Sequence, residues 1–95
     1  MKKPPRKSGF RFGKRQYVVI TRYASQKKLR SLFMNTIGED CVLEGLWDNQ
    51  LGEGKPWFAG YIYIYNRMPL RKQWAIYDHE LRHAVHDVLA WEGEL

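Results

Sequence analysis

Residues 74–90 constrain the fold of this chain most, because their apolar side chains recur at the spacing of an α-helix. One side of the predicted helix is apolar and consists of Trp74, Tyr77, Leu81, Val85 and Val88. The other side carries all three histidines of the chain, His79, His83 and His86. A helix of this kind buries its apolar side in a core and exposes its polar side. We therefore expect a helix that packs on a core and presents a row of histidines.

The length and composition of the chain indicate a single small domain. Its 95 residues can enclose one core, and 44% of them are apolar, with four Trp, six Tyr and four Phe. No apolar run approaches the roughly 20 residues that cross a bilayer, so no membrane partner is expected. The single Cys41 excludes an internal disulfide, and residues 1–15 contain no apolar signal segment. We expect a cytoplasmic protein whose one domain covers residues 16–95.

Residues 1–15 are rich in lysine and arginine, contain Pro4 and Pro5, and contribute much of the net charge of +6. This composition favours a disordered basic arm. The arm is also a candidate for binding nucleic acid, because basic side chains contact phosphate backbones. The residues that would make these contacts are Lys2, Lys3, Arg6, Lys7, Arg11, Lys14 and Arg15. The alternative is a tail that only improves solubility.

The rest of the chain has the patterns of three strands and one more helix. Residues 16–22 and 41–47 are rich in β-branched, aromatic and other apolar residues, which favours strands. Residues 25–38 start at Ser25, a good N-cap, carry apolar residues three and four apart, and stop at a glycine, as an amphipathic helix does. Residues 58–66 alternate tyrosine and isoleucine, so Ile62 and Ile64 are expected to face the core.

The tyrosines of this last strand share one face and are Tyr61, Tyr63 and Tyr65. Such a row can line a groove for an extended peptide, which makes these residues candidates for substrate binding. Cross-strand packing on a half-exposed sheet is the alternative. Together the elements predict an α+β fold, in which a small antiparallel or mixed sheet of about three strands packs against two helices. The histidine-bearing helix is the C-terminal one.

The sequence His79-Glu80-Leu81-Arg82-His83 matches the H-E-x-x-H pattern of metal sites. Residues four apart on a helix lie on the same side about one turn apart, so the two histidines can bind one ion. Glu80 lies on the flank of this pair, where a carboxylate can take a proton from a metal-bound water. The alternative is a solvated polar helix whose histidines titrate without binding a metal.

These residues resemble the active-site helix of the zincin metallopeptidases, and the likeness extends loosely to the α-β-β-α order from Ser25 onward. The resemblance implies that His79 and His83 bind Zn²⁺ and that Glu80 is the catalytic base and later proton donor. In zincins an edge strand before this helix pairs with the peptide substrate, and residues 60–66 are our candidate for that strand. The resemblance therefore implies a minimal single-domain member of the superfamily.

A third metal ligand is harder to assign, because catalytic zinc normally has three protein ligands. Leu89 stands where a metzincin would have its third histidine, and the chain has no room after His83 for the second helix that carries the glutamate of gluzincins. His86 lies about 10.5 Å along the helix axis from His79, too far for joint ligation on an unbroken helix. Glu92 is therefore the first candidate and Glu94 an alternative, and His86 stays an alternative only if the helix is interrupted.

The first functional hypothesis is a zinc-dependent metallopeptidase that hydrolyses peptide or protein substrates through a metal-bound water and Glu80. The second is a small basic protein, of a kind found in phages or other mobile elements, that binds nucleic acid while its metal site is structural or absent. The third is an adaptor that a metal stabilises although its site is too incomplete for catalysis.

Overall fold

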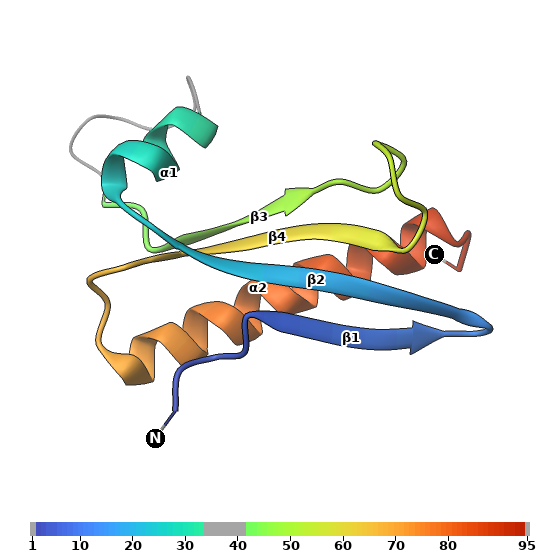
Figure 1. Ribbon diagram of the computed structural model, residues 1–95, viewed down its shortest axis with the longest axis horizontal. Helices are drawn as coiled ribbons and strands as arrows, with labels where there is room; N and C mark the ends of the chain where they lie inside the picture. Colours follow the sequence, from blue (N-terminus) through green and yellow to red (C-terminus); the bar gives the residue numbers. More distant parts are fainter. Residues whose placement is uncertain (1, 34–41, 95) are drawn as a thin grey trace.

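The computed structural model describes residues 2–33 and 42–94 of the chain. Its elements in chain order are β1 (Lys7–Phe12), β2 (Arg15–Ala24), α1 (Gln26–Leu32), β3 (Gly45–Asn49), β4 (Phe58–Tyr65) and α2 (Leu70–Trp91). The strands form one mixed sheet in the order β1-β2-β4-β3. Helix α2 lies across one face of this sheet, behind it in Figure 1, and α1 lies near one end of the sheet. The expected α+β fold, with a sheet and two helices, is confirmed.

The pairing of the strands makes β1 and β3 the two edges of the sheet. Strand β1 pairs antiparallel with β2, β2 pairs parallel with β4, and β4 pairs antiparallel with β3. Strand β4 therefore has a neighbour on both sides. Residues 60–66, which we expected to form an edge strand, lie in and just after this central strand, because β3 folds back onto the outer side of β4.

Strand β1 was not expected, because the sequence around it was interpreted as a disordered arm. Its residues alternate between exposed and half-buried, and Phe10 and Phe12 pack against the core between the sheet and α2. The hydroxyl groups of Ser8 and Tyr77 form a hydrogen bond that also ties β1 to α2. Burial of two phenylalanines on one side of the strand outweighs the charged residues on the other side. The sheet consequently has four strands instead of about three.

The main core lies between the sheet and α2. Its buried side chains are Tyr17, Val19, Ala59, Ile62, Ile64, Ile76, Tyr77, Ala84 and Val88. The isoleucines of β4 and the residues Tyr77 and Val88 of α2 are buried, as the sequence pattern indicated. Val85 is 37% exposed, so its assignment to the core side was wrong. The small Ala84 occupies the centre of the buried side instead, and this orientation of the helix leaves Glu80 half-buried.

A second cluster lies on the other face of the sheet, where α1 covers one end. Leu29 of α1 packs there with Ala24, Leu43, Leu46 and Tyr63, and Tyr61 and Tyr65 pack around them. The helix starts as expected, with the hydroxyl of Ser25 accepting a hydrogen bond from the backbone N–H of Lys28 at 3.2 Å. The rest of the expected helix after Phe33, and Cys41, lie outside the described residues.

A close approach of the chain at Gly60 shapes the junction between β3 and β4. Gly60 has a φ of 154°, and a Cβ atom built there would lie 2.1 Å from the backbone oxygen of Asp48. Only glycine fits this position, since any side chain would push β3 away from β4. The pairing of β2 with β4 shifts register beside it, between Val18 and Val19.

Of the helices in residues 2–33 and 42–94, none is long and apolar enough to span a membrane.

Candidate functional site

His79 and His83 lie one turn apart on the exposed side of α2. Their Nε2 atoms are 3.1 Å apart, and the two rings meet edge to face with centroids 4.7 Å apart. A tetrahedral zinc ion bound to two imidazole nitrogens at about 2.05 Å requires those nitrogens to be about 3.3 Å apart. The two nitrogens are within hydrogen-bond distance of each other, and their separation is close to the spacing that a shared ion requires.

Glu80 lies next to this pair and is half-buried. Its burial raises the pKa of the carboxyl group, and electrostatic interactions with His83 and His79 oppose this shift. A carboxyl group with a raised pKa exchanges protons closer to neutral pH than an ordinary surface glutamate does. The side chain is thus suited to accept and return a proton beside His79 and His83.

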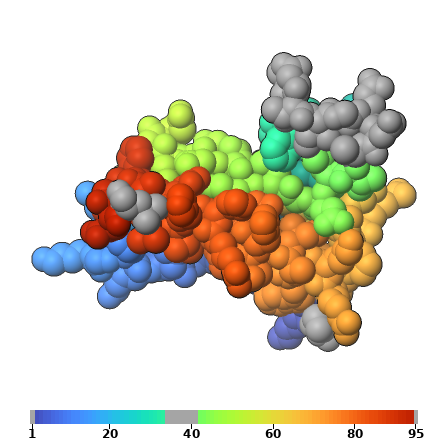
Figure 2. All heavy atoms as spheres, turned by 180° about the vertical axis from the view of Figure 1, so that it is seen from behind, coloured from blue at the N-terminus to red at the C-terminus, as the bar shows by residue number. Residues whose placement is uncertain are grey.

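A cleft of about 360 Å³ lies between His79 and Glu80 on α2 and the start of the edge strand β3. The residues that line it are Glu44, Gly45, Ala75, Ile76, His79 and Glu80. Gly45 begins the edge strand β3, and a Cβ atom at this position would lie 2.3 Å from Cγ2 of Ile76. The missing side chain lets the backbone of β3 approach α2 closely. Figure 2 shows the green region that contains β3 running alongside the orange residues of α2.

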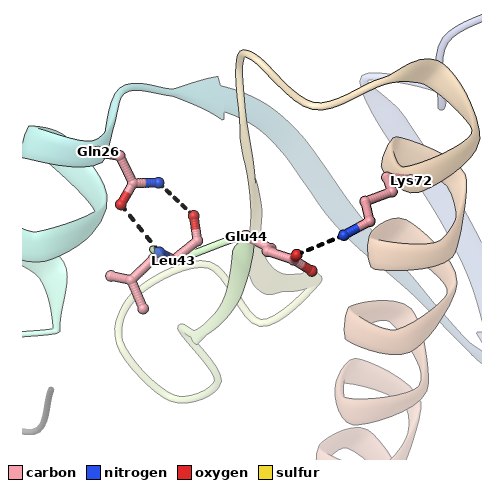
Figure 3. A network of polar contacts seen from close by, with 4 residues as sticks. All are labelled: Gln26, Leu43, Glu44 and Lys72. Carbon is pink, nitrogen blue, oxygen red and sulfur yellow. Dashed lines mark hydrogen bonds and ion pairs between the residues drawn. The ribbon is translucent and has the colours of Figure 1, made fainter. Parts of the chain in front are cut away.

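Strand β3 is held against α2 by polar contacts near both of its ends. The carboxylate of Asp87 accepts hydrogen bonds from Nε1 of Trp47 at 2.8 Å and from Nδ2 of Asn49 at 2.9 Å. Just before the strand, Nζ of Lys72 lies 2.9 Å from Oε1 of Glu44 (Figure 3). Along α2, His79 and His83 fall between Lys72 and Asp87. The edge strand is therefore fixed beside the histidine pair.

The segment before β3 is also tied to α1. The side-chain amide of Gln26 donates a hydrogen bond to the backbone oxygen of Leu43 and accepts one from its backbone N–H at 3.0 Å (Figure 3). Through Leu43 and Glu44, this short connection links α1 to α2. The sequence pattern did not indicate that Glu44, Gly45 and Asp87 position β3 beside α2. The contacts that do so join each of them to residues distant along the chain.

The candidates for a third metal ligand lie apart from the histidine pair. Glu92 caps the C-terminal end of α2, where it accepts a hydrogen bond from the hydroxyl of Tyr17 and lies 3.6 Å from Nη1 of Arg15. Glu94 follows it and is exposed, and His86 lies 3.8 Å from Oδ1 of its neighbour Asp87. In the part of the chain that the structure describes, no three His, Cys, Asp or Glu residues are grouped so that they could hold a metal ion.

Tyr61, Tyr63 and Tyr65 lie on the face of the sheet opposite α2. They belong to the cluster around Leu29, and the rings of Tyr61 and Tyr63 are 5.8 Å apart. The sheet separates them from His79, so the structure does not bring the expected substrate-binding residues to the histidine site. Packing between neighbouring strands, the alternative interpretation of this row, agrees with these contacts.

The basic residues near the N-terminus are divided between different surfaces. The backbone oxygen of Lys2 accepts a hydrogen bond from Trp74, and Nζ of Lys3 lies 5.0 Å from the centre of the Tyr23 ring. Arg15 lies beside Glu92, whereas Lys7 and Arg11 point to the face opposite α2. The arm that we expected to be disordered therefore contains strand β1, and its basic residues lie on separate surfaces of the folded domain.

In comparisons with family models, curated proteins and solved structures, nothing matches this chain. Its function is therefore inferred from the chemistry of His79, Glu80 and His83 and from the edge strand beside them.

Proposed function

We propose that the chain is a zinc-dependent peptidase of the H-E-x-x-H type, in which His79 and His83 bind the metal ion and Glu80 transfers protons. The observation that carries this proposal is the 3.1 Å separation of the two Nε2 atoms, directly beside a cleft that also contains Glu80. A bound zinc ion would polarise a carbonyl group and lower the pKa of a water molecule.

The donor set fits zinc, because neutral imidazole nitrogens are among its preferred ligands. Two histidines leave the remaining coordination positions open, and catalytic zinc sites generally use a third protein ligand. Glu44 and Glu80 are the two carboxylates that line the cleft with His79. Since Glu80 is assigned to proton transfer, Glu44 is the first residue to test as the third ligand, a role that would require its side chain to move toward the histidines. Its present partner, Lys72, is more than half exposed, so the cost of exchanging this ion pair for a metal contact is small.

The edge strand supports an extended peptide as the substrate. Among the described strands, β3 pairs with β4 alone, so its outer backbone N–H and C=O groups face away from the sheet that these strands form and could pair with another strand. A peptide added at this edge would run along the cleft that contains His79 and Glu80. Glu80 would take a proton from the attacking water and donate one to the leaving amine, while Asp87 keeps β3 in place.

The test combines metal content with peptide hydrolysis. Zinc should bind to the metal-free protein, and the loaded protein should cleave a mixture of quenched fluorescent peptides. The substitution Glu80→Gln should keep the zinc and reduce hydrolysis by about a hundredfold or more. The matched control is Asp78→Asn, because Asp78 is an exposed acid on the same helix that pairs with Arg82. A wild-type protein that binds no zinc would contradict the proposal, as would full activity in the Glu80 variant.

A second function is favoured by the presence of only two histidines at the site within residues 2–33 and 42–94. In this alternative, zinc stabilises an adaptor and no hydrolysis occurs. Zinc would then raise the midpoint of thermal unfolding, since a ligand that binds only the folded state stabilises it. His79→Ala and His83→Ala would abolish that shift. Peptides would stay intact with both the wild-type protein and the Glu80→Gln variant.

A further inference from the structure

The face of the sheet opposite α2 faces the viewer in Figure 1. Strand register and pocket lining place aromatic and basic residues on it. We call it the open face and define it by Lys7, Arg11, Val18, Ile20, Arg22, Lys55, Trp57, Phe58 and Tyr61. Strand alternation places the members from β1 and β2 there, since their neighbours in sequence pack toward α2. Among the described elements, α1 covers this face only near Ala24 and Tyr63.

The aromatic rings of the open face form a continuous series. The rings of Trp57 and Phe58 have centroids 6.2 Å apart, and those of Phe58 and Tyr61 are 4.9 Å apart. Trp57 is 46% exposed, although burial of so large an apolar ring would be favourable. Lys55, Trp57, Phe58 and Tyr61 line a pocket together with Ile20. The exposed ring of Trp57 and the half-buried rings of Phe58 and Tyr61 border this pocket and offer surfaces on which planar groups can stack.

The charges around these rings are mainly positive. The guanidinium group of Arg22 lies 4.3 Å from the centre of the Tyr61 ring, and Nζ of Lys55 lies 5.2 Å from the Trp57 ring. Lys7 and Arg11 extend the positive charge along β1. The acidic residue Asp48 lies opposite Tyr61 in the sheet, and its carboxylate accepts a hydrogen bond from Gln50 at 3.1 Å. The surface is thus complementary to a flexible polyanion.

We propose that the open face binds single-stranded nucleic acid. Bases stack on Trp57, Phe58 and Tyr61, and phosphates contact Lys7, Arg11 and Lys55. Aromatic stacking platforms with adjacent basic side chains are the common means of binding unpaired strands, because every base has a π-face. A duplex keeps its bases stacked inside the helix, so its phosphates would contact the basic side chains while its bases could not stack on the aromatic rings. An acidic peptide would likewise contact the basic side chains without stacking on the aromatic rings.

This activity is independent of the proposed peptidase, since the sheet lies between the open face and His79. The probe is a fluorescently labelled oligo(dT) or oligo(U) of about 12 nucleotides, within the range of site sizes of single-strand binders. Binding is followed by fluorescence anisotropy with the full chain, without added metal. With three phosphate contacts, the plot of log affinity against log salt should have a slope of about −2.

Charge and stacking are tested with separate variants. The double substitution Lys7→Gln and Arg11→Gln should reduce the magnitude of the salt slope by about 1.4. Its control is Arg71→Gln with Arg82→Gln, which removes the same charge from α2. Trp57→Ala and Tyr61→Ala should each weaken binding about tenfold, whereas Trp91→Ala, at the exposed end of α2, should leave the affinity unchanged. Circular dichroism establishes that each variant is folded.

Several results would overturn the proposal. One is binding that is undetectable or insensitive to salt in the folded wild-type protein. Another is equal weakening by Trp91→Ala and Trp57→Ala. Competition by polyglutamate as effective as that by oligo(U), with no effect of Trp57→Ala, would assign the face to acidic peptides. A dimer in sedimentation experiments that Trp57→Ala dissociates would assign it to a second copy of the chain.

Discussion

The carboxylate of Asp87 accepts a hydrogen bond from Nε1 of Trp47 at 2.8 Å and thereby joins the histidine-bearing helix to the edge strand of the sheet. The same oxygen also accepts a hydrogen bond from Asn49. This contact determines where β3 lies relative to His79 and His83. In the proposed peptidase, it therefore determines where a bound peptide would meet the metal ion.

Substitution of Asp87 by alanine should destabilise the protein by about 1 to 3 kcal/mol, because it leaves the half-buried indole N–H of Trp47 without its acceptor. Urea unfolding monitored by circular dichroism measures the change. The control, Asp78→Ala, breaks an exposed pair with Arg82 and should change the stability by less than about 0.5 kcal/mol. Equal effects of the two substitutions would show that Asp87 does not anchor the strand.

The substitution Glu92→Gln should leave zinc affinity within about twofold of the wild-type value, because Glu92 lies about 13.5 Å beyond His83 along the helix axis. It should lower the stability by less than about 1 kcal/mol instead, since the amide oxygen can still accept the hydrogen bond from Tyr17 and only the charge that also attracts Arg15 is lost. Competition with a fluorescent zinc chelator measures the affinity, and His83→Ala is the positive control. A large loss of zinc affinity in Glu92→Gln would place this residue at the metal.

Gly45→Ala should destabilise the protein by about 1 to 3 kcal/mol, because the new methyl group would overlap Cγ2 of Ile76 and approach the backbone oxygen of Tyr63. If the overlap with Ile76 is the cause, Ile76→Ala should relieve part of it. The double variant would then be less destabilised than the sum of the two single variants. Gly54→Ala is the control, since a Cβ atom there meets no other atom within 4 Å. Additive effects in the double variant would rule out the overlap.

The substitution Tyr23→Phe should be neutral or slightly stabilising at neutral pH. The hydroxyl of Tyr23 is buried and has no hydrogen-bond partner in residues 2–33 and 42–94, so its removal avoids an unsatisfied polar group. Burial also raises the pKa of this hydroxyl, and the charge of Arg6 opposes the shift. A loss of more than about 1 kcal/mol in Tyr23→Phe at neutral pH would indicate that the hydroxyl has a stabilising partner.

The raised pKa of Tyr23 also predicts how stability depends on alkaline pH. The folded state favours the neutral phenol. The contribution of the raised pKa to the stability of the fold is therefore fully present at pH values below the unfolded pKa of about 10. It is lost as the pH rises through the higher pKa of the folded state. Urea unfolding at a series of alkaline pH values should therefore show a smaller loss of stability in Tyr23→Phe than in the wild-type protein. If the stability of the two proteins depended on pH in the same way, a raised pKa of Tyr23 would be contradicted.

Local patterns predicted most of the elements but not strand β1. Residues 58–66 and 74–90 have clear periods of two and 3.6 residues, and they form β4 and α2. In β1, Phe10 and Phe12 also alternate with charged residues, but the prolines and basic residues around them favoured disorder. The alternation is stabilising only because α2 and β2 provide a core for the two rings. That core cannot be recognised within the segment itself.

The sequence by itself determined that His79 and His83 are adjacent, because the spacing of four residues on a helix is a local property. It also determined the burial of Ile62 and Ile64 through strand alternation. Only the tertiary structure decided that β3 is the strand beside Glu80, that Asp87 holds it there and that Glu92 points to Tyr17. These relationships join residues 40 and 75 positions apart, and they depend on which strands pair and how α2 packs on the sheet.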